Sequence, residues 1–474
     1  MVFSSALFLF LFLPIVLIFY YNPIIKKRGY RNAILLISSL IFYAWGEPVF
    51  VLLMITSIII NFAIGLAIDK NDSYAKRKVW LITAIIFDVL VIFIFKYLGF
   101  TVNNICTLAG IDNVKVNIAL PIGISFFTFQ IMSYIFDVYY KKAKAQKNVF
   151  DLALYISMFP QLVAGPIVRY ETIADEIGNR VELPAQFTAG MIRFIYGLGK
   201  KVLISNYVAQ IADNIFVLES VSVSSAWLGA IAYSLQIFFD FSGYSDMAIG
   251  LGLVFGFHFN ENFNYPYIAK SITDFWRRWH ISLSTWFRDY VYIPLGGNRV
   301  SKPRWVFNMF VVWLLTGIWH GANWTFIAWG LFYFVLLATE KLLNTNKNYG
   351  KLKVLPHIST LLFVIIGWVL FRSESISDAI RYIGNMFGIG ATSFVDDLFM
   401  YYLDNGKLIL IVSLILSTPV MRVISSKMKV ASENKIGLAV VYDAVKSVVA
   451  LAIFVLSVLC CVSSSYNPFI YFNF

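Results

Sequence analysis

Long uninterrupted apolar runs are the feature that most limits what this chain can fold into. An α-helix needs roughly 20 apolar residues to cross a bilayer core of about 30 Å. The 474-residue chain is 59% hydrophobic and 14% charged, whereas a soluble globular domain carries about 25% charged residues. The sequence therefore predicts an all-α polytopic membrane protein. Clear spans are predicted at residues 3–21, 32–45, 49–68, 79–98, 118–139, 226–256, 324–343, 357–371, 407–421 and 437–462.

Three further apolar stretches are interrupted and give a weaker signal, at residues 150–168, 189–215 and 305–319. All the runs together predict about eleven transmembrane helices plus re-entrant or interfacial helices. No internal repeat and no low-complexity linker divides the chain, so we expect a single domain over residues 1–474. The first run lacks a basic flank and a small-residue cleavage site, which favours a retained helix over a signal peptide.

Lysine and arginine concentrate in alternate loops. The clusters are Lys26–Arg31, Lys70–Lys78, Lys141–Lys147, Lys341–Lys353 and Arg422–Lys435. Basic loops stay on the cytoplasmic side of a membrane, so the pattern predicts these clusters inside and both termini outside. The net charge of +12 follows from this topology and from contact with membrane lipids. No basic domain suggests nucleic-acid binding.

This orientation places residues 373–405 outside the membrane. Within them, SISDAIRYIGNMF at residues 375–387 has the spacing of an amphipathic helix. We expect that helix to lie on the outer leaflet.

Two of the four histidines lie in a tryptophan-rich stretch. His280 occurs in DFWRRWHISLSTWFRDY and His320 in LLTGIWHGANW. An ionisable side chain at membrane depth is costly and is therefore a functional-site hypothesis. Glycines flank His320 and let a backbone or a substrate approach its ring, and Trp319 and Asn323 lie beside it. The alternatives are a core histidine at position 320 and an interfacial polar residue at position 280.

The segment around His280 predicts one amphipathic helix over residues 272–290, because its apolar residues recur in three- and four-residue steps. Asp274 and Arg278 have the i,i+4 spacing of an ion pair on its polar side. Arg277 and Arg278 can attract the phosphates of a donor or carrier. We therefore expect His280 near the donor, on the cytoplasmic side of a cavity.

A second polar group interrupts an apolar run in FDFSGYSDMAIG, residues 239–250. Asp240 and Asp246 are expensive at membrane depth unless they are paired or hydrated. We expect one of three roles for these two carboxylates. They orient a histidine, they pair with Arg277 or Arg278, or they shape a kinked helix. The predicted substrate-binding residues are Asp240, Tyr244, Asp246, Arg277, Arg278, Trp319 and Asn323. Helix breaks that predict a cavity within residues 150–320 are Pro160, Gly165–Pro166, Gly197, Gly199, Gly243, Pro266 and Gly296–Gly297.

The residue types limit the chemistry. Cys106, Cys460 and Cys461 lack metal-ligand spacing, and no phosphate-binding loop, nucleophile elbow or zinc signature is present. We therefore expect no metal and no bound cofactor. The simplest reaction for a neutral imidazole is general base catalysis, in which it takes the proton of an acceptor hydroxyl as that hydroxyl attacks an acyl carbonyl.

Five motifs and the C-terminal NPFIYFNF (467–474) resemble the bacterial branch of the membrane-bound O-acyltransferase family, whose members modify alginate, peptidoglycan and other glycans. The motifs are FWRRWHISLSTWFRDYVYIPLGGNR, TGIWHGANW, FDFSGYSDMAIG, LPIGISFFTFQ and FPQLVAGPI. The resemblance implies many helices around a central funnel, with His320 as the essential catalytic residue and His280 as a second, more variable polar position.

The resemblance also implies a direction of transfer in the bacterial cytoplasmic membrane. An acyl group, most simply acetyl, passes outward from a cytoplasmic donor, either acetyl-CoA or a carrier-bound acyl group. A separate extracytoplasmic partner of the SGNH or acetylase type completes the O-acetylation of a polysaccharide or cell-wall glycan. Two alternatives stay open, namely D-alanyl transfer to teichoic acid and a transporter or flippase without acyl chemistry.

Overall fold

The computed structural model of the chain describes residues 1–112, 114, 116, 118–343, 354–432, 436–463, 466–468 and 470. No strand occurs among these residues, so the all-α prediction is confirmed. Parts of the predicted cytoplasmic clusters Lys341–Lys353 and Arg422–Lys435, and of the motif at 467–474, lie outside the described residues.

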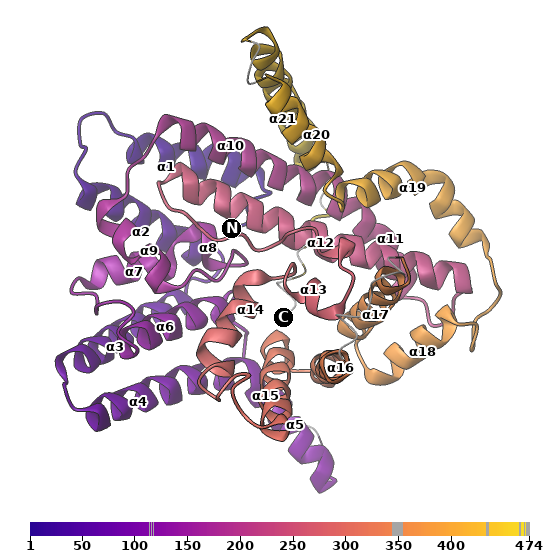
Figure 1. Cartoon of the computed structure of the whole chain (residues 1–474), viewed down its shortest axis with the longest axis horizontal. Coiled ribbons are helices and arrows are strands. Elements are labelled where there is room, and N and C mark those ends of the chain that lie inside the picture. The colour runs from indigo at the N-terminus through magenta and orange to yellow at the C-terminus, as the bar shows by residue number, and fades with distance from the viewer. Residues whose placement is uncertain are drawn as a thin grey trace. The chain divides into compact units, whose positions relative to one another are not determined.

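Two compact units make up the described chain (Figure 1). Unit 1 comprises Met1–Phe194 and Met247–Asn260, and unit 2 comprises Ile195–Asp246 and Glu261–Phe474. Two long helices, α10 (Pro184–Gly199) and α12 (Val223–Val254), contribute residues to both units.

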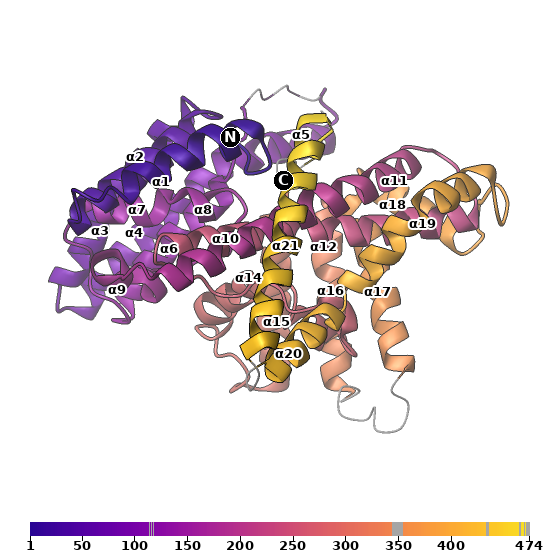
Figure 2. The ribbon, with the colours of Figure 1, turned by 90° about the horizontal axis from the view of Figure 1, so that it is seen from above.

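Unit 1 is a group of helices in which the long helix α6 is almost wholly buried. Every residue of α6 from Ile124 to Val138 is buried, and α6 packs against its neighbours α3 and α4 (Figure 2). The helices of unit 1 are η1 (Phe8–Phe12), α1 (Leu13–Tyr20), α2 (Arg28–Ala44), α3 (Phe50–Lys70), α4 (Tyr74–Ile92), η2 (Phe93–Tyr97), α5 (Leu98–Ala109), α6 (Ile124–Tyr139), α7 (Val149–Ser157), α8 (Phe159–Leu162) and α9 (Tyr170–Asn179).

The helix predicted at residues 118–139 begins later than the apolar run, at Ile124. Pro121 lacks a backbone donor, and Gly123 adopts a left-handed conformation with φ of 75°. A Cβ atom at Gly123 would lie 2.9 Å from the carbonyl oxygen of Leu162. The start of α6 is therefore set by a close approach to α8 that only glycine allows.

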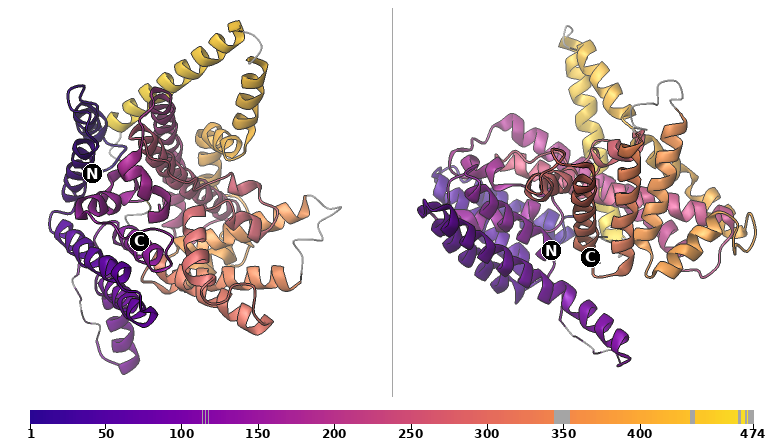
Figure 3. Two further views of the ribbon diagram at one scale, coloured as in Figure 1. Left: turned by 60° about the vertical axis from the view of Figure 1, so that its left-hand side comes forward. Right: turned by 60° about the horizontal axis from the view of Figure 1, so that its bottom comes forward.

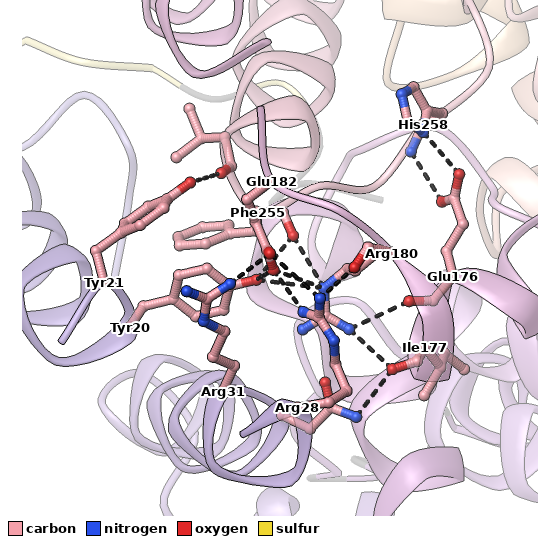
Figure 4. A network of polar contacts seen from close by, with 12 residues as sticks. Tyr20, Tyr21, Arg28, Arg31, Glu176, Ile177, Arg180, Glu182, Phe255 and His258 are labelled. Atoms are coloured by element: carbon pink, nitrogen blue, oxygen red, sulfur yellow. Dashed lines mark hydrogen bonds and ion pairs between the residues drawn. The ribbon is translucent and has the colours of Figure 1, made fainter. Parts of the chain in front are cut away.

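A buried arginine network ties together four segments of unit 1 (Figure 4). Arg180, whose side chain is fully buried, donates from Nε to the Phe255 carbonyl at 3.0 Å and from Nη1 to the Ile177 carbonyl at 2.9 Å. Glu182 accepts hydrogen bonds from Arg28, Arg31 and Tyr20. Burial opposes ionisation of Glu182, but the hydrogen bonds from Arg28 and Tyr20 outweigh it and lower the pKa of this carboxyl.

Unit 2 contains α15 and α16 packed side by side, with α17 beside α16 (Figure 3). The other helices of unit 2 are shorter or lie toward the C-terminus, where α20 and α21 pack together. The helices are η3 (Lys200–Ser205), α11 (Asn206–Phe216), η4 (Pro266–Ile268), α13 (Ile272–Trp276), α14 (Ile281–Phe287), η5 (Arg288–Tyr292), α15 (Lys302–His320), α16 (Trp324–Leu342), α17 (Leu355–Arg372), α18 (Ile376–Met386), α19 (Asp397–Leu416), α20 (Val420–Ser432) and α21 (Ile436–Ser463).

Seven helices among the described residues are long and apolar enough to cross a membrane, so the chain has the character of a multi-pass membrane protein. The predicted count of about eleven is not confirmed. Helices α2, α6 and α10 have 17, 16 and 16 residues and are therefore shorter than a full span. The run at 150–168 divides into α7 and α8. The amphipathic helix predicted at 375–387 is confirmed as α18, which is capped by Ser375.

Two predictions about local backbone were wrong. Residues 272–290 do not form one helix, because the chain turns between α13 and α14, where His280 is left-handed with φ of 44°. Gly197 and Gly243 do not break their helices, since both lie inside continuous α10 and α12. A Cβ atom at Gly243 would lie 2.8 Å from the Gly197 carbonyl oxygen, so these glycines allow two helices to cross closely.

Arg180→Met should destabilise the protein, because methionine fills a similar volume but removes the buried guanidinium that donates to the Phe255 and Ile177 carbonyls. These carbonyls would keep only the hydrogen bonds from Tyr20 and Asn32. Removing one partner of a buried charged network costs about 3–5 kcal/mol. The measurement is the apparent melting temperature in detergent, with Lys27→Met as the control at an exposed position. Equal melting temperatures of the two variants would show that the network does not stabilise unit 1.

Candidate active site

His320 is the last residue of α15, at the turn that leads into α16. Asn323 shapes this turn: its Oδ1 accepts from the Thr325 amide at 3.1 Å, and its Nδ2 donates to the Glu374 carbonyl at 2.9 Å. Both the oxygen and the nitrogen of the Asn323 side-chain amide are therefore hydrogen-bonded to backbone groups. The structure gives Asn323 a role in holding the turn that carries His320, beside its predicted role in substrate binding.

Aromatic rings surround His320, which is 5% exposed. The ring centroids of Trp319 and Trp329 each lie 4.9 Å from the imidazole, and that of Phe371 lies at 5.0 Å. The flanking glycines bring α16 close, since a Cβ atom at Gly317 would lie 2.5 Å from the Phe326 carbonyl oxygen. The approach predicted for these glycines is thus made by the protein's own α16.

His280 lies at the turn between α13 and α14 and is 1% exposed. Its Nδ1 is 3.1 Å from the Asn262 Oδ1. An amide oxygen only accepts hydrogen bonds, so Nδ1 carries the hydrogen and Nε2 keeps its lone pair. Within the described part of the chain, the buried Nε2 has no hydrogen-bond partner. The turn therefore presents a basic ring nitrogen that the fold itself does not use.

Burial also determines the protonation state of His280, which lies outside the seven candidate spans. Loss of water around the ring lowers the pKa of His280 from its ordinary value of 6.5. The imidazole is therefore neutral at physiological pH, as the lone pair on Nε2 requires.

Asn262 organises the surroundings of His280 and was not among the predicted site residues. Its Oδ1 also accepts from the Ser282 amide at 3.2 Å and the Ser282 hydroxyl at 2.9 Å, while its Nδ2 donates to the Ser245 hydroxyl at 3.0 Å. Each end of this amide is engaged, so Asn262 fixes the orientation of the His280 ring. An asparagine in a loop gives no sequence signal for this role.

The two histidines share a neighbour in Trp319. The Trp319 centroid lies 6.0 Å from that of His280 and 4.9 Å from that of His320. On its other side His280 meets the edge of Phe241, with the ring centroids 4.6 Å apart. The fold thus gathers both imidazoles of the tryptophan-rich stretch into one aromatic site within unit 2.

The carboxylates of α12 pair with lysines of η3. Asp240 and Lys201 are 1% and 2% exposed, and their charged atoms lie 2.6 Å apart. The Asp240 Oδ2 also accepts from the Ile470 amide at 3.0 Å, and Lys201 donates to the Pro468 carbonyl. This ion pair anchors the C-terminal segment inside unit 2. Lys201 is a second residue that sequence reasoning missed, although a lysine within an apolar run gives the same signal as a histidine.

The remaining predicted residues lie in different surroundings. Asp246 pairs with Lys200 at 2.6 Å, so the pairings seen for the two carboxylates are with lysines, in place of the predicted Arg277 or Arg278. Arg278 pairs with Asp274 at 2.8 Å, as predicted, and the Arg277 side chain is exposed. Tyr244 is buried in α12.

The other two histidines, His258 and His357, contact groups outside the aromatic site. His258 is an exposed residue of unit 1, where its Nδ1 lies 2.7 Å from a Glu176 oxygen. The Nδ1 of His357 lies 2.9 Å from the Ala269 carbonyl oxygen.

Comparison with known proteins identifies the fold. The profile described as "MBOAT, membrane-bound O-acyltransferase family" matches residues 37–376, which include both site histidines. The chain belongs to the membrane-bound O-acyltransferase family. It is therefore an O-acyltransferase.

The chain is similar to three proteins that are named for their activities. The probable alginate O-acetylase AlgI of Pseudomonas aeruginosa is 47% identical over 395 residues, covering 82% of this chain and 75% of the relative. The peptidoglycan O-acetyltransferase of Helicobacter pylori is 35% identical over 431 residues, covering 83% and 81%. The teichoic acid D-alanyltransferase of Bacillus subtilis is 31% identical over 277 residues, covering 54% and 70%.

Asn262→Ala should lower the rate of acyl transfer by roughly 10–100-fold, because a lost acceptor leaves the His280 Nδ1–H and the Ser282 donors buried and unsatisfied at a cost of about 1–3 kcal/mol. The rate is measured on purified protein in detergent. The matched control is Asn264→Ala, two residues away with an exposed side chain. Equal rates for the two alanine variants would contradict the role of Asn262.

Proposed function

We propose that the enzyme transfers an acetyl group from a cytoplasmic donor to a hydroxyl group of an extracytoplasmic polysaccharide or cell-wall glycan, with His320 as the general base. The observation that carries the proposal is the aromatic site in which Trp319 neighbours both buried imidazoles. Acetyl is favoured because the relatives named for O-acetylation match 82–83% of the chain, whereas the D-alanyltransferase matches 54%.

The proposed step needs one base and no covalent enzyme intermediate. An acceptor oxygen attacks the carbonyl carbon of a thioester, either acetyl-CoA or a carrier-bound acetyl group, and His320 takes the proton of the hydroxyl group. The new carbon–oxygen bond forms as the carbon–sulfur bond breaks, and the proton passes from His320 to the departing thiolate. The aromatic rings around His320 exclude water and so protect the thioester from hydrolysis.

His280 supports this reaction as a second polar group, on the donor side. Its neutral ring and the lone pair on Nε2 provide a buried acceptor, while the Asn262 amide keeps the ring in place. A donor that presents an N–H or O–H group would satisfy Nε2 on binding. That gain would favour a correctly seated donor.

A polar hollow provides the proposed acceptor side. It has a volume of about 560 Å³ and is lined by the ends of α11, α17 and α18, including Asp213, Arg372 and Asp378. Arg372 directly follows Phe371, whose ring lies against His320. We propose that the acceptor, or an extracytoplasmic SGNH or acetylase-type partner that presents it, approaches His320 from this side. Apolar side chains of α18 such as Ile376 and Ile380 are exposed beside it.

D-alanyl transfer is the second candidate, because the Bacillus subtilis relative carries that activity in its name. The two candidates use the same attack on a thioester and differ in the acyl group. Labelled acetyl donor and labelled D-alanyl donor, supplied separately to the purified enzyme, distinguish them by which label reaches the acceptor.

His320→Ala should reduce acetyl transfer by about 10²–10⁴-fold, which is the usual contribution of a general base. The assay measures transfer of labelled acetyl groups in membranes that contain equal amounts of each variant. His258→Ala is the matched control, because it removes an exposed imidazole of unit 1. Near-normal transfer by the His320 variant would exclude its role as base.

The proposed orientation predicts which loops are accessible from outside the cell. In a background with Cys106, Cys460 and Cys461 replaced by serine, Thr392→Cys should react with an impermeant maleimide in intact cells. Lys144→Cys should react only after the membrane is opened. Both positions have exposed side chains, so access to the reagent depends on the side of the membrane. The reverse pattern would invert the orientation and the direction of acetyl export.

A further inference from the structure

A second polar cluster lies in unit 1, between two membrane-spanning helices and apart from the histidines. Asp88 lies on α4, and Ser57 and Asn61 lie one turn apart on α3. Both helices belong to candidate membrane spans, and they pack against each other. The three residues are 2%, 2% and 0% exposed. A carboxyl group is therefore held at membrane depth beside the Asn61 amide, which in turn bonds to the Ser57 backbone.

The hydrogen bonds of this cluster leave it short of donors. The Asn61 Nδ2 uses its two hydrogens, one for the Asp88 Oδ1 at 2.8 Å and one for the Ser57 carbonyl at 3.0 Å. Among the described residues, no partner is present for the Asp88 Oδ2, the Asn61 Oδ1 or the Ser57 hydroxyl. An ionised Asp88 would leave two buried acceptors and one donor. One added proton turns the Asp88 Oδ2 into a donor, and the cluster still holds the Asn61 Oδ1 as an acceptor.

No cation neutralises Asp88 within the described part of the chain, where its side chain bonds only to Asn61. An unpaired carboxylate in an apolar interior is far costlier than a neutral carboxyl, and such groups take up a proton instead. Other charged groups on α3, α4, η2 and α6 are engaged or exposed at helix ends. They are Asp69 and Lys70, which are exposed, Lys76 and Lys78 on the first turns of α4, Arg77, which bonds to the Tyr139 carbonyl, Lys96, which bonds to Ser125, and Asp137, which accepts from the Glu171 amide.

We propose that Asp88, Asn61 and Ser57 form a proton-binding site within the helices of unit 1, in which the Asp88 carboxyl carries a proton in the folded protein. The protonated Oδ2 donates to an acceptor of the cluster, and Oδ1 keeps the hydrogen bond from Asn61. Folding then binds a proton at neutral pH, since an exposed aspartate is ionised there. Stability contributed by this site is present at low pH and is lost as the pH rises.

Dicyclohexylcarbodiimide, which reacts with protonated carboxyl groups in apolar surroundings, is the probe. The carboxyl proton moves to a carbodiimide nitrogen as the carboxyl oxygen bonds to the central carbon, and acyl migration then leaves a stable N-acylurea on Asp88. Mass spectrometry of the purified full chain in detergent should find this adduct on Asp88. The yield should fall as the pH is raised. Asp240 is an equally buried internal control that should stay unmodified, because it is paired with Lys201.

Asp88→Asn provides the second measurement, because an asparagine amide reproduces the donor and acceptor of a protonated carboxyl. The variant should melt near the wild-type temperature at low pH and above it at alkaline pH, where only the wild type loses its proton. Infrared spectra should show a protonated carboxyl band in the wild type that this variant lacks.

Three results would overturn the proposal. Protection of Asp88 from the carbodiimide by sodium ions at constant pH would show a monovalent cation site instead. Equal labelling of Asp88 and Asp240 would show that protonation does not distinguish them. Absence of both the adduct and the infrared band would show that Asp88 is ionised.

Discussion

A polar group buried in an apolar interior has no water to bind, and the protein must supply its partner. This constraint explains the contacts at the centre of both units. In unit 2 the ammonium group of Lys201 and the carboxylate of Asp240 pair at 2.6 Å in almost complete burial. The Ile470 amide donates to the Asp240 carboxylate, and the Lys201 ammonium donates to the Pro468 carbonyl. A pair of opposite charges thereby positions a chain end that lies more than 200 residues away in sequence.

Because of the same constraint, a buried polar atom that the fold leaves without a partner indicates a binding site. His280 adopts a left-handed conformation with φ of 44°, which is unfavourable for a residue with a side chain and persists only where the surroundings enforce it. The Asn262 Oδ1 accepts hydrogen bonds from the His280 ring and from the Ser282 amide of this turn, yet the Nε2 atom is not used by the fold. Strain together with an unsatisfied basic nitrogen is characteristic of a site prepared for a ligand. At Asp88 the unsatisfied atom is a carboxyl oxygen, for which a proton suffices.

Hydropathy predicted the long spans well, because a run such as 324–343 needs only a bilayer to form a helix, and the structure has α16 at Trp324–Leu342. Local backbone chemistry was less predictable. The apolar steps of 272–290 continue through His280, yet the chain turns there between α13 and α14, and Asn262 bonds to the Ser282 amide of that turn. Glycines inside α10 and α12 look like helix breakers in the sequence, but close helix crossing uses them instead.

The site itself was predictable to the extent that it is local. One short motif contains Trp319, His320 and Asn323, which are close together in the sequence. The partners of Asp240 could not be found in this way, because Lys201 lies 39 residues before it and its pairing depends on how η3 packs against α12. Likewise, Asn262 reaches His280 across 18 residues through a loop whose path no periodicity describes.

The central claim is that acyl transfer takes place at His320, beside Trp319. The most direct measurement is an experimental structure of the enzyme with a non-reactive acetyl thioester analogue bound. The account predicts the acetyl group in the aromatic site, with space for an acceptor oxygen about 3–3.5 Å from its carbonyl carbon and within hydrogen-bond reach of the His320 imidazole. An acetyl group bound away from the rings of Trp319, Trp329 and Phe371 would contradict the account.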